Sequence, residues 1–188
     1  MDKVFKSLGA KVSTSEREEN DFYATNPDAV KFLLEKETFR HDVWECCCGM
    51  GHLSREIENA GYNVISSDIV DRGYPDTHIA NVMDAEENVY DVITNPPYKN
   101  AQEIIQHLID ISKPGTKIAM FLKVLFLESR ERRKLFDNHP PKTIYVSSKR
   151  IVCAKDGDFD SITSSAIAYA WYVWEVGYTG DTIVKWVN

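Results

Sequence analysis

The 188-residue sequence lacks the features that define several classes of protein. Its most apolar stretches, 118–127 and 166–174, are much shorter than the roughly 20 residues that a membrane span requires. The first 21 residues contain no apolar core of the kind found in signal peptides. We therefore expect a cytoplasmic protein that makes no contact with a membrane.

Cysteine is scarce, and its placement is unusual. Three of the four cysteines, Cys46, Cys47 and Cys48, are consecutive, and the fourth is Cys153. Adjacent cysteines pair poorly as disulfides, and no Cys/His spacing is typical of a zinc site. We expect free thiols and no bound metal.

The chain also lacks an overall basic charge, since its net charge is −7. That value alone argues against a basic nucleic-acid coat protein. Residues 113–155, however, hold eleven basic and three acidic residues, a local net charge of +8. This distribution favours either a phosphate-binding surface or a solvated helix face. The candidate phosphate contacts are Arg130, Arg132, Arg133, Lys149 and Arg150.

Segments with helical periodicity alternate with short apolar runs, a pattern typical of a mainly parallel sheet in an α/β protein. The predicted helices are 27–36, 52–60 and 101–112, and the predicted strands are 42–48, 62–67, 78–82, 90–94 and 117–122. Two later strand-like runs, 143–152 and 165–176, have no helix between them and predict an antiparallel pair at one edge. Trp171 and Trp174 lie an odd number of residues apart and should face opposite sides of their strand.

The chain shows no internal division after its first residues. Residues 1–20 are expected to be a polar arm, loose or with a short surface helix, and 21–188 are expected to be one domain without a separate target-recognition domain.

The residues just after the predicted strands point to a ligand site, because parallel sheets bind ligands at the carboxyl ends of their strands. Gly49 and Gly51 would allow a sharp turn and a close backbone approach. Asp68 follows Gly49 at about the 20-residue spacing expected of an acid that accepts from ribose hydroxyls. A structural turn explains the glycines equally well, and caps explain Asp68 and Asp84.

The run Asn95, Pro96, Pro97 and Tyr98 is the most specific signal. Two prolines fix φ and remove two N–H donors, so this turn cannot continue as helix or sheet. The Asn95 side-chain oxygen and the Pro96 carbonyl are then free to face one donor group. Tyr98 adds a flat face for stacking. The alternative is an ordinary strand-ending turn.

These motifs resemble those of the class I S-adenosylmethionine (SAM)-dependent methyltransferases that carry a [DNS]PP[YF] signature. Within this class the chain is similar to small phage and prophage DNA adenine-N6 methyltransferases, on three segments. They are FYATNP at 22–27, E-x-x-x-G-x-G at 45–51 and AYAWYVW at 168–174. The resemblance implies a Rossmann-like fold with a mainly parallel seven-stranded sheet, an antiparallel edge hairpin and a bacterial or phage origin.

The resemblance also assigns roles, with SAM as cofactor and S-adenosylhomocysteine as product. The methionine end would be held by Tyr23, Thr25, Glu45, Cys46, Cys47, Gly49 and Gly51. The nucleoside end would be held by Asp68 at the ribose hydroxyls, by Ile69 against the adenine ring, and by Asp84 with Ala85 at the adenine amino group. Asn95 would touch the cofactor and, with Pro96, Pro97 and Tyr98, the acceptor amine. Phe159 would cover the other face of the acceptor base, or would be a core aromatic instead.

The expected reaction is methyl transfer to the N6 amino group of adenine in DNA. A glutamine side-chain amide or an RNA base presents the same planar nitrogen and remains an alternative, as does a non-catalytic SAM-fold binding protein. We expect DNA as the partner and a monomer or homodimer, with a recognition sequence that is short, weak or supplied by oligomerisation.

Overall fold

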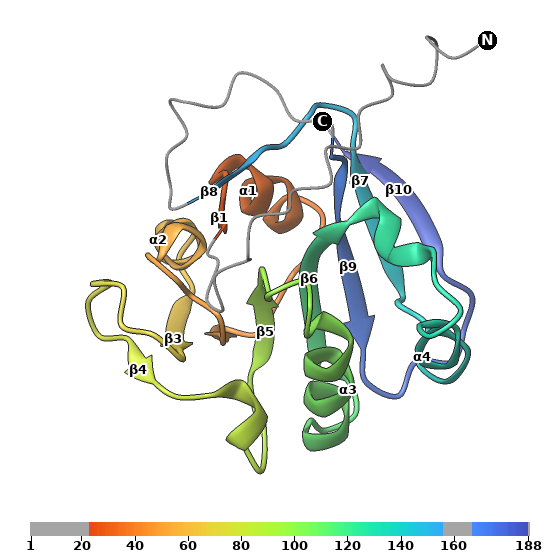
Figure 1. Ribbon diagram of the computed structural model, residues 1–188, viewed down its shortest axis with the longest axis horizontal. Coiled ribbons are helices and arrows are strands. Elements are labelled where there is room, and N and C mark those ends of the chain that lie inside the picture. Colours follow the sequence, from red (N-terminus) through yellow and green to blue (C-terminus); the bar gives the residue numbers. More distant parts are fainter. Residues whose placement is uncertain (1–22, 156–166, 188) are drawn as a thin grey trace, which may run out of the picture.

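One mixed sheet runs through the computed structural model, which is described for residues 23–155 and 167–187 (Figure 1). Within those residues the sheet has eight strands in the order β10-β7-β9-β6-β5-β2-β3-β4. A separate antiparallel ribbon joins β1 to β8. The polar arm and Phe159 lie outside the described residues, as does everything else that was predicted for residues 1–22 and 156–166.

The strands of the sheet are β2 (Asp42–Glu45), β3 (Asn63–Asp68), β4 (His78–Ile79), β5 (Asp91–Thr94), β6 (Lys117–Lys123), β7 (Thr143–Ser147), β9 (Tyr169–Glu175) and β10 (Ile183–Val187). The ribbon consists of β1 (Tyr23–Thr25) and β8 (Cys153–Lys155). The helices are α1 (Asp28–Leu34), α2 (His52–Asn59), α3 (Ala101–Ile111) and α4 (Arg133–Asn138), with short 3₁₀ turns η2 (Val82–Asp84) and η3 (Val124–Leu127). No helix in the described part of the chain is long and apolar enough to cross a membrane.

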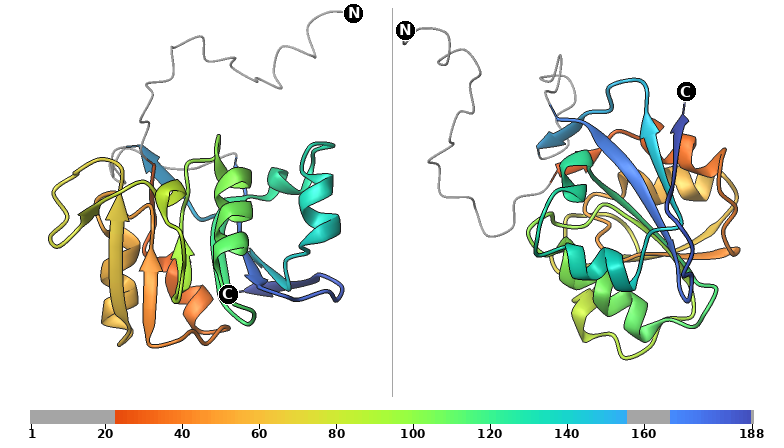
Figure 2. Two further views of the ribbon diagram at one scale, coloured as in Figure 1. Left: turned by 90° about the horizontal axis from the view of Figure 1, so that it is seen from below. Right: turned by 90° about the vertical axis from the view of Figure 1, so that its right-hand side faces the viewer.

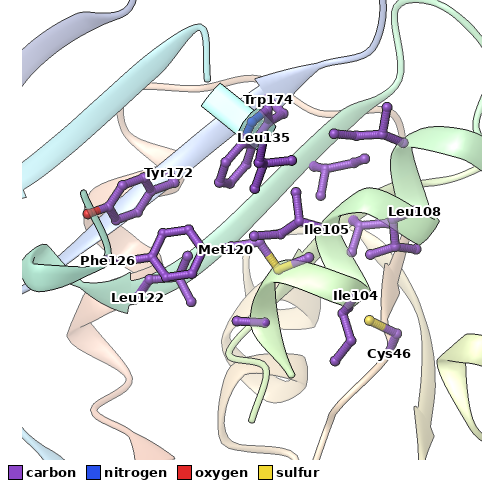
Figure 3. Close-up of a cluster of buried hydrophobic side chains, with 14 of the residues drawn as sticks. Cys46, Ile104, Ile105, Leu108, Met120, Leu122, Phe126, Leu135, Tyr172 and Trp174 are labelled. Atoms are coloured by element: carbon purple, nitrogen blue, oxygen red, sulfur yellow. The ribbon is translucent and has the colours of Figure 1, made fainter. Parts of the chain in front are cut away.

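Helices cover both faces of the sheet, with α1 and α2 on one side and α3 and α4 on the other (Figure 2). Successive side chains of a strand point to opposite faces, so each face has its own hydrophobic core. On the α3 side, Ile105 and Leu108 of α3 pack against Met120 and Leu122 of β6 (Figure 3). Trp171 belongs to the α1 and α2 side and Trp174 to the α3 side, which confirms the expectation from their spacing.

The α/β fold class and the mainly parallel sheet are confirmed. The antiparallel pairing of β7 with β9 is also present, but β9 lies between β6 and β7 instead of at the edge. Six of the seven residues of β9 are buried, as expected of a strand covered on both faces. The edge is formed by β10, an eighth strand that pairs parallel to β7 and that the sequence did not predict.

Three predicted strands end early. The strand predicted for 78–82 stops at Ile79. The strand predicted for 42–48 stops at Glu45, so the three consecutive cysteines belong to the loop that follows it. The strand predicted for 143–152 stops at Ser147. The ribbon strands β1 and β8 have three residues each, too few to show a period of two, and this is why periodicity missed them.

The direction of strand addition reverses between β2 and β5. From β2 the chain adds β3 and β4 on one side, and it then returns to add β5 and β6 on the other. This is a topological switch point, where loops leave the sheet in opposite directions and open a crevice. The loop after Glu45 and the loop that begins at Asn95 flank this crevice.

Burial in α1 leads to a stability prediction. Leu33 is fully buried against the sheet, whereas Leu125 in η3 is 65% exposed. Leu33→Ala should lower the free energy of unfolding by about 2–5 kcal/mol, because it leaves a cavity in a packed core. Leu125→Ala should change it by less than about 0.5 kcal/mol. Urea denaturation followed by circular dichroism measures both, and equal effects would contradict this packing.

Candidate active site

A small pocket lies at the switch point and encloses about 220 Å³ of empty space, part of it open to solvent. Four chain segments contribute to it: β1, the loop after β2, the start of α2 and the loop after β5. Its lining residues are Ala24, Thr25, Glu45, Cys47, Cys48, His52, Leu53 and Asn95. Four of the predicted site residues, Thr25, Glu45, Cys47 and Asn95, are therefore brought together here. The buried Thr25 side chain lies opposite Cys153 in the β1–β8 ribbon and interacts with its thiol.

The glycine loop that borders the pocket is a tight turn, closed by a hydrogen bond of 2.8 Å from Gly51 N to Cys48 O. Gly49 and Gly51 have φ values of 55° and 74°, in the left-handed region that favours glycine. The N–H of Gly49 donates to Asp68 Oδ2 at 2.8 Å. The loop therefore depends on both glycines and on the acid at the end of β3.

Both carboxylate oxygens of Asp68 accept a hydrogen bond from a backbone N–H group. Besides Gly49, it accepts a hydrogen bond of 3.0 Å from Val70 N through Oδ1, and its side chain is buried. The spacing between Gly49 and Asp68 in the sequence thus reflects an intramolecular bond between two adjacent loops. Carboxylate oxygens can accept more than one hydrogen bond, so the predicted contact with a ribose stays a prediction.

Glu45 is a buried carboxyl at the base of the pocket, with 1% of its surface exposed. The Ser54 hydroxyl donates to its Oε2, and Ser54 in turn lies 2.9 Å from the hydroxyl of Ser66. Burial raises the pKa of Glu45 to about 8, which keeps the carboxyl largely protonated at neutral pH. A cation placed beside it would favour the charged form.

The three consecutive cysteines divide between the core and the pocket. The side chain of Cys46 is buried in the α3-side core near Ile104 (Figure 3), so the predicted cofactor contact of Cys46 is limited to its backbone. Cys47 and Cys48 line the pocket instead. Burial raises the pKa of the Cys48 thiol to about 12. The hydrogen bond with Cys46, followed by burial, raises the pKa of the Cys47 thiol well above its usual value. Neutral thiols are poor nucleophiles. All four cysteines are free, as expected.

The Asn-Pro-Pro-Tyr turn places Asn95 in the pocket lining, with Pro96 buried and Pro97 exposed. Tyr98 packs against both hydrophobic cores. The Nζ atom of Lys123 lies 4.8 Å from the Tyr98 ring centroid, and the Tyr169 ring lies 6.0 Å away.

The Tyr98 hydroxyl is 3.7 Å from Sγ of Cys153, and burial raises the pKa of this phenol. The Tyr98 ring can therefore stack on an acceptor base only if it exchanges one of these contacts.

Several predicted cofactor residues do not line the pocket. The Ile69 side chain is 57% exposed, Asp84 is exposed at the end of η2, and Ala85 is half-buried. Tyr23 lies in β1 by its backbone, and its side chain is not described. Sequence reasoning also missed Ala24, Cys48, His52 and Leu53. The predicted start of a helix directly after Gly51 was the signal that could have found His52 and Leu53.

The predicted basic residues differ in what they contact. Arg132 donates to the backbone oxygens of Phe126 and Glu128 at 2.7 and 2.9 Å, so it holds the chain between η3 and α4. Arg133 pairs with Asp137 at 2.6 Å. The side chains of Arg130, Lys149 and Arg150 are exposed.

Acidic residues outside the segment 113–155 also neutralise part of its positive charge. Lys117 pairs with Glu37 and Lys142 with Glu175, both at 2.7 Å. Lys117, Arg133 and Lys142 therefore already have acidic partners within the protein.

Comparison with solved structures identifies the fold. Neither a protein-family model nor a curated protein sequence matches the chain. A type I restriction-modification system methyltransferase subunit from Streptococcus thermophilus matches with a TM-score of 0.62 and 13% identity, over 90% of this chain and 48% of that one. A dimethyladenosine transferase from Plasmodium falciparum matches with 0.55 and 17%, over 81% and 62%. A protein from Pyrococcus horikoshii, assigned as an RNA methyltransferase, matches with 0.54 and 15%, over 78% and 79%.

These likenesses show that the chain has the Rossmann-like fold of the class I SAM-dependent methyltransferases. The chain spans about half the length of the Streptococcus subunit and less than two thirds of the Plasmodium enzyme. With so few identical residues, the likeness is one of fold.

The buried carboxyl of Glu45 leads to a pH prediction. Its pKa in the folded protein, about 8, lies above the ordinary value of 4.5, so the folded state binds the extra proton between these values. Stability from this group is complete below pH 4.5 and is lost as the pH rises towards 8. The stability of the wild type should fall relative to Glu45→Gln by up to about 1.4 kcal/mol per pH unit. Urea denaturation of both proteins across this window measures the difference, and parallel pH profiles would contradict it.

Proposed function

We propose that this protein is a SAM-dependent methyltransferase whose acceptor is the exocyclic N6 amino group of adenine in DNA. The observation that carries the proposal is the pocket at the switch point of a class I methyltransferase fold. It joins the buried acid Glu45, the hydroxyl of Thr25 and the amide of Asn95 from segments far apart in the sequence.

The pocket residues fit one end of SAM, which carries a sulfonium and an ammonium cation. Glu45 would accept from the ammonium, and ionisation of its carboxyl would then be favoured by the added positive charge. The hydroxyl of Thr25 in the pocket lining offers a further hydrogen bond. Asp68, Ile69, Asp84 and Ala85 do not line this pocket and would bind the nucleoside end.

The sulfonium group supplies an electrophilic methyl, and the residues of this chain prepare the acceptor nitrogen. The lone pair of an exocyclic amine on an aromatic ring is conjugated and nucleophilically weak. Asn95 Oδ1 and the Pro96 carbonyl would accept its two hydrogens and favour rehybridisation towards sp³ as the nitrogen attacks. Since this interaction strengthens towards the transition state, it raises kcat as well as binding. The proton leaves after the new N–C bond has formed, so no strong base is required.

DNA is the favoured acceptor because exposed cations follow η3 and β7 in the chain. Arg130, Lys149 and Arg150 are exposed and can contact phosphates. An adenine in a duplex must leave the base stack to reach Asn95, and Tyr98 is the aromatic residue of the same turn that could stack on it. A glutamine amide or an RNA base would present the same planar nitrogen to Asn95. The following experiment distinguishes these acceptors from DNA.

The acceptor is tested with radiolabelled SAM, which is incubated separately with unmethylated DNA, RNA and cellular protein, followed by digestion and product analysis. We expect label in N6-methyladenine from DNA. Label only in methylglutamine or in an RNA nucleoside would replace the DNA assignment. Binding of SAM without any transfer would indicate a non-catalytic binding protein.

Asn95→Ala separates catalysis from cofactor binding. Removing one of the two acceptors should lower kcat by about 10²–10³-fold, the usual effect of losing one transition-state hydrogen bond. The affinity for S-adenosylhomocysteine, measured by calorimetry, should change by less than about threefold, which is under about 0.7 kcal/mol. Asn59→Ala, at the exposed end of α2, serves as the control. Equal losses of binding and turnover in Asn95→Ala would remove the catalytic role.

The exposed and ion-paired cations predict different salt effects. Lys149→Gln should weaken DNA binding and reduce the slope of log K against log salt by about 1, because one phosphate contact is lost. Lys142→Gln makes the same substitution where the lysine already pairs with Glu175, and it should leave the slope unchanged. Fluorescence anisotropy over a salt series measures both slopes. A wild-type affinity that does not depend on salt would exclude a phosphate-binding surface.

A further inference from the structure

Tyr74 lies directly against the glycine loop. A Cβ atom added to Gly51 would overlap three atoms of the Tyr74 ring, so the ring occupies the space that any other residue at position 51 would need. Tyr74 belongs to the segment between β3 and β4, which the motifs did not single out. The requirement for glycine at position 51 therefore has a cause within the protein, in addition to its positive φ.

Arg55 of α2 connects this ring to the loop. Its guanidinium lies 4.8 Å from the Tyr74 ring centroid, and its Nη1 donates to the Met50 carbonyl oxygen at 2.8 Å. The Tyr74 hydroxyl donates to Oε1 of Glu58, one turn further along α2, at 3.1 Å. Ring, guanidinium and carboxylate thus form one connected cluster. We call Tyr74, Arg55 and Glu58 the brace.

The brace contacts the glycine loop at Met50 and Gly51, which do not line the pocket. Asp68 fixes the N–H of Gly49, Arg55 fixes the carbonyl of Met50, and the Tyr74 ring fixes the space beside Gly51. None of the three brace residues lines the pocket, whereas Cys48 and His52, at the two ends of the same turn, both do.

The segment that carries Tyr74 is itself tied to this turn. Thr77 donates from its hydroxyl to the Tyr74 carbonyl at 2.8 Å, and this hydroxyl lies 3.6 Å from Sγ of Cys48.

We propose that Tyr74 and Arg55 are positioning residues that hold the glycine loop in its cofactor-binding conformation, an inference that rests on the proposed function. A turn with two glycines has many accessible conformations, and ordering it upon binding would cost conformational entropy. A loop that is already fixed in the free protein avoids that cost and binds its ligand more tightly. The brace therefore sets the affinity for SAM without touching the acceptor.

The first test measures affinity and turnover separately. Tyr74→Ala should raise the Kd for S-adenosylhomocysteine about tenfold, equivalent to about 1.4 kcal/mol. The KM for SAM should rise in parallel, while kcat at saturating SAM stays within about twofold, because Asn95 and Pro96 are untouched. Tyr74→Phe keeps the ring on Gly51 and should restore the affinity to within about twofold. Arg55→Lys, at an exposed position, should weaken binding in the same direction and provides a variant should Tyr74→Ala fail to fold.

Tyr178→Ala is the matched control. Tyr178 is also half-buried, donates from its hydroxyl to Asp181 O at 2.8 Å, and has the Nζ of Lys142 5.7 Å from its ring centroid. It lines a different pocket, beside β9, and should leave the affinity for S-adenosylhomocysteine unchanged.

A double-mutant cycle tests the contact itself. Gly51→Ala should weaken binding strongly in the wild type, where the new methyl group meets the ring. In the Tyr74→Ala background it should weaken binding much less, because only the strain of the positive φ remains. Additive effects would show that the ring does not restrict the loop.

The outcomes distinguish the brace from the proposed function. If the wild type binds S-adenosylhomocysteine but Tyr74→Ala and Arg55→Lys bind it equally well, the brace is overturned and the function stands. If the wild type binds no S-adenosylhomocysteine and transfers no methyl group, the function fails together with the cofactor role of the brace. Hydrogen exchange of the Met50 and Gly51 amides in the ligand-free proteins then shows whether the loop was fixed at all. A fall in kcat without a change in Kd would also contradict a positioning role.

Discussion

The hydrogen bond from Gly49 N–H to the Asp68 carboxylate is the contact on which the candidate site depends. It ties the loop after β2 to the end of β3, next to the switch point, and so fixes the turn that leads into α2. Because α2 begins directly after that turn, the bond also sets where His52 and Leu53 enter the pocket. Glu45, the last residue of the neighbouring strand β2, is bonded to Ser54 of α2, and burial raises its pKa.

The parts of the site that were predictable are those in which local sequence restricts the backbone. The prolines after Asn95 and the glycines after Glu45 limit φ, and the carboxyl ends of parallel strands must share one edge of the sheet. Thr25 was found only through a family resemblance. Tyr74 reaches the glycine loop through tertiary packing, and no periodicity encodes such a contact. The internal position of β9 was likewise decided by burial on both faces, which a strand-like pattern does not distinguish from an edge pair.

The spatial distribution of the basic residues was also not predictable from the sequence alone. Eleven basic residues in the segment 113–155 suggested one surface, but the sheet separates neighbours in sequence by placing the two ends of each strand far apart. Lys117 and Lys123 are the first and last residues of β6: one pairs with Glu37, and the other lies over the ring of Tyr98. Arg132 directs its donors to backbone oxygens. What remains for an anionic partner is a smaller group of exposed cations, and its affinity depends on their placement more than on their number.

In the proposed function, the Tyr98 ring would stack on the acceptor base, but in the free protein it already contacts a basic side chain. Its ring touches both hydrophobic cores and carries the Lys123 ammonium 4.8 Å from its centroid, so the aromatic face already has a partner when no base is present. An ammonium over a ring is held by electrostatic attraction of about 0.5–2 kcal/mol, a contact that a stacking base can replace. On the proposed function, a flipped adenine that stacks on this face would have to displace the Lys123 ammonium from the ring. The lysine contact and base stacking would therefore compete for one face of Tyr98.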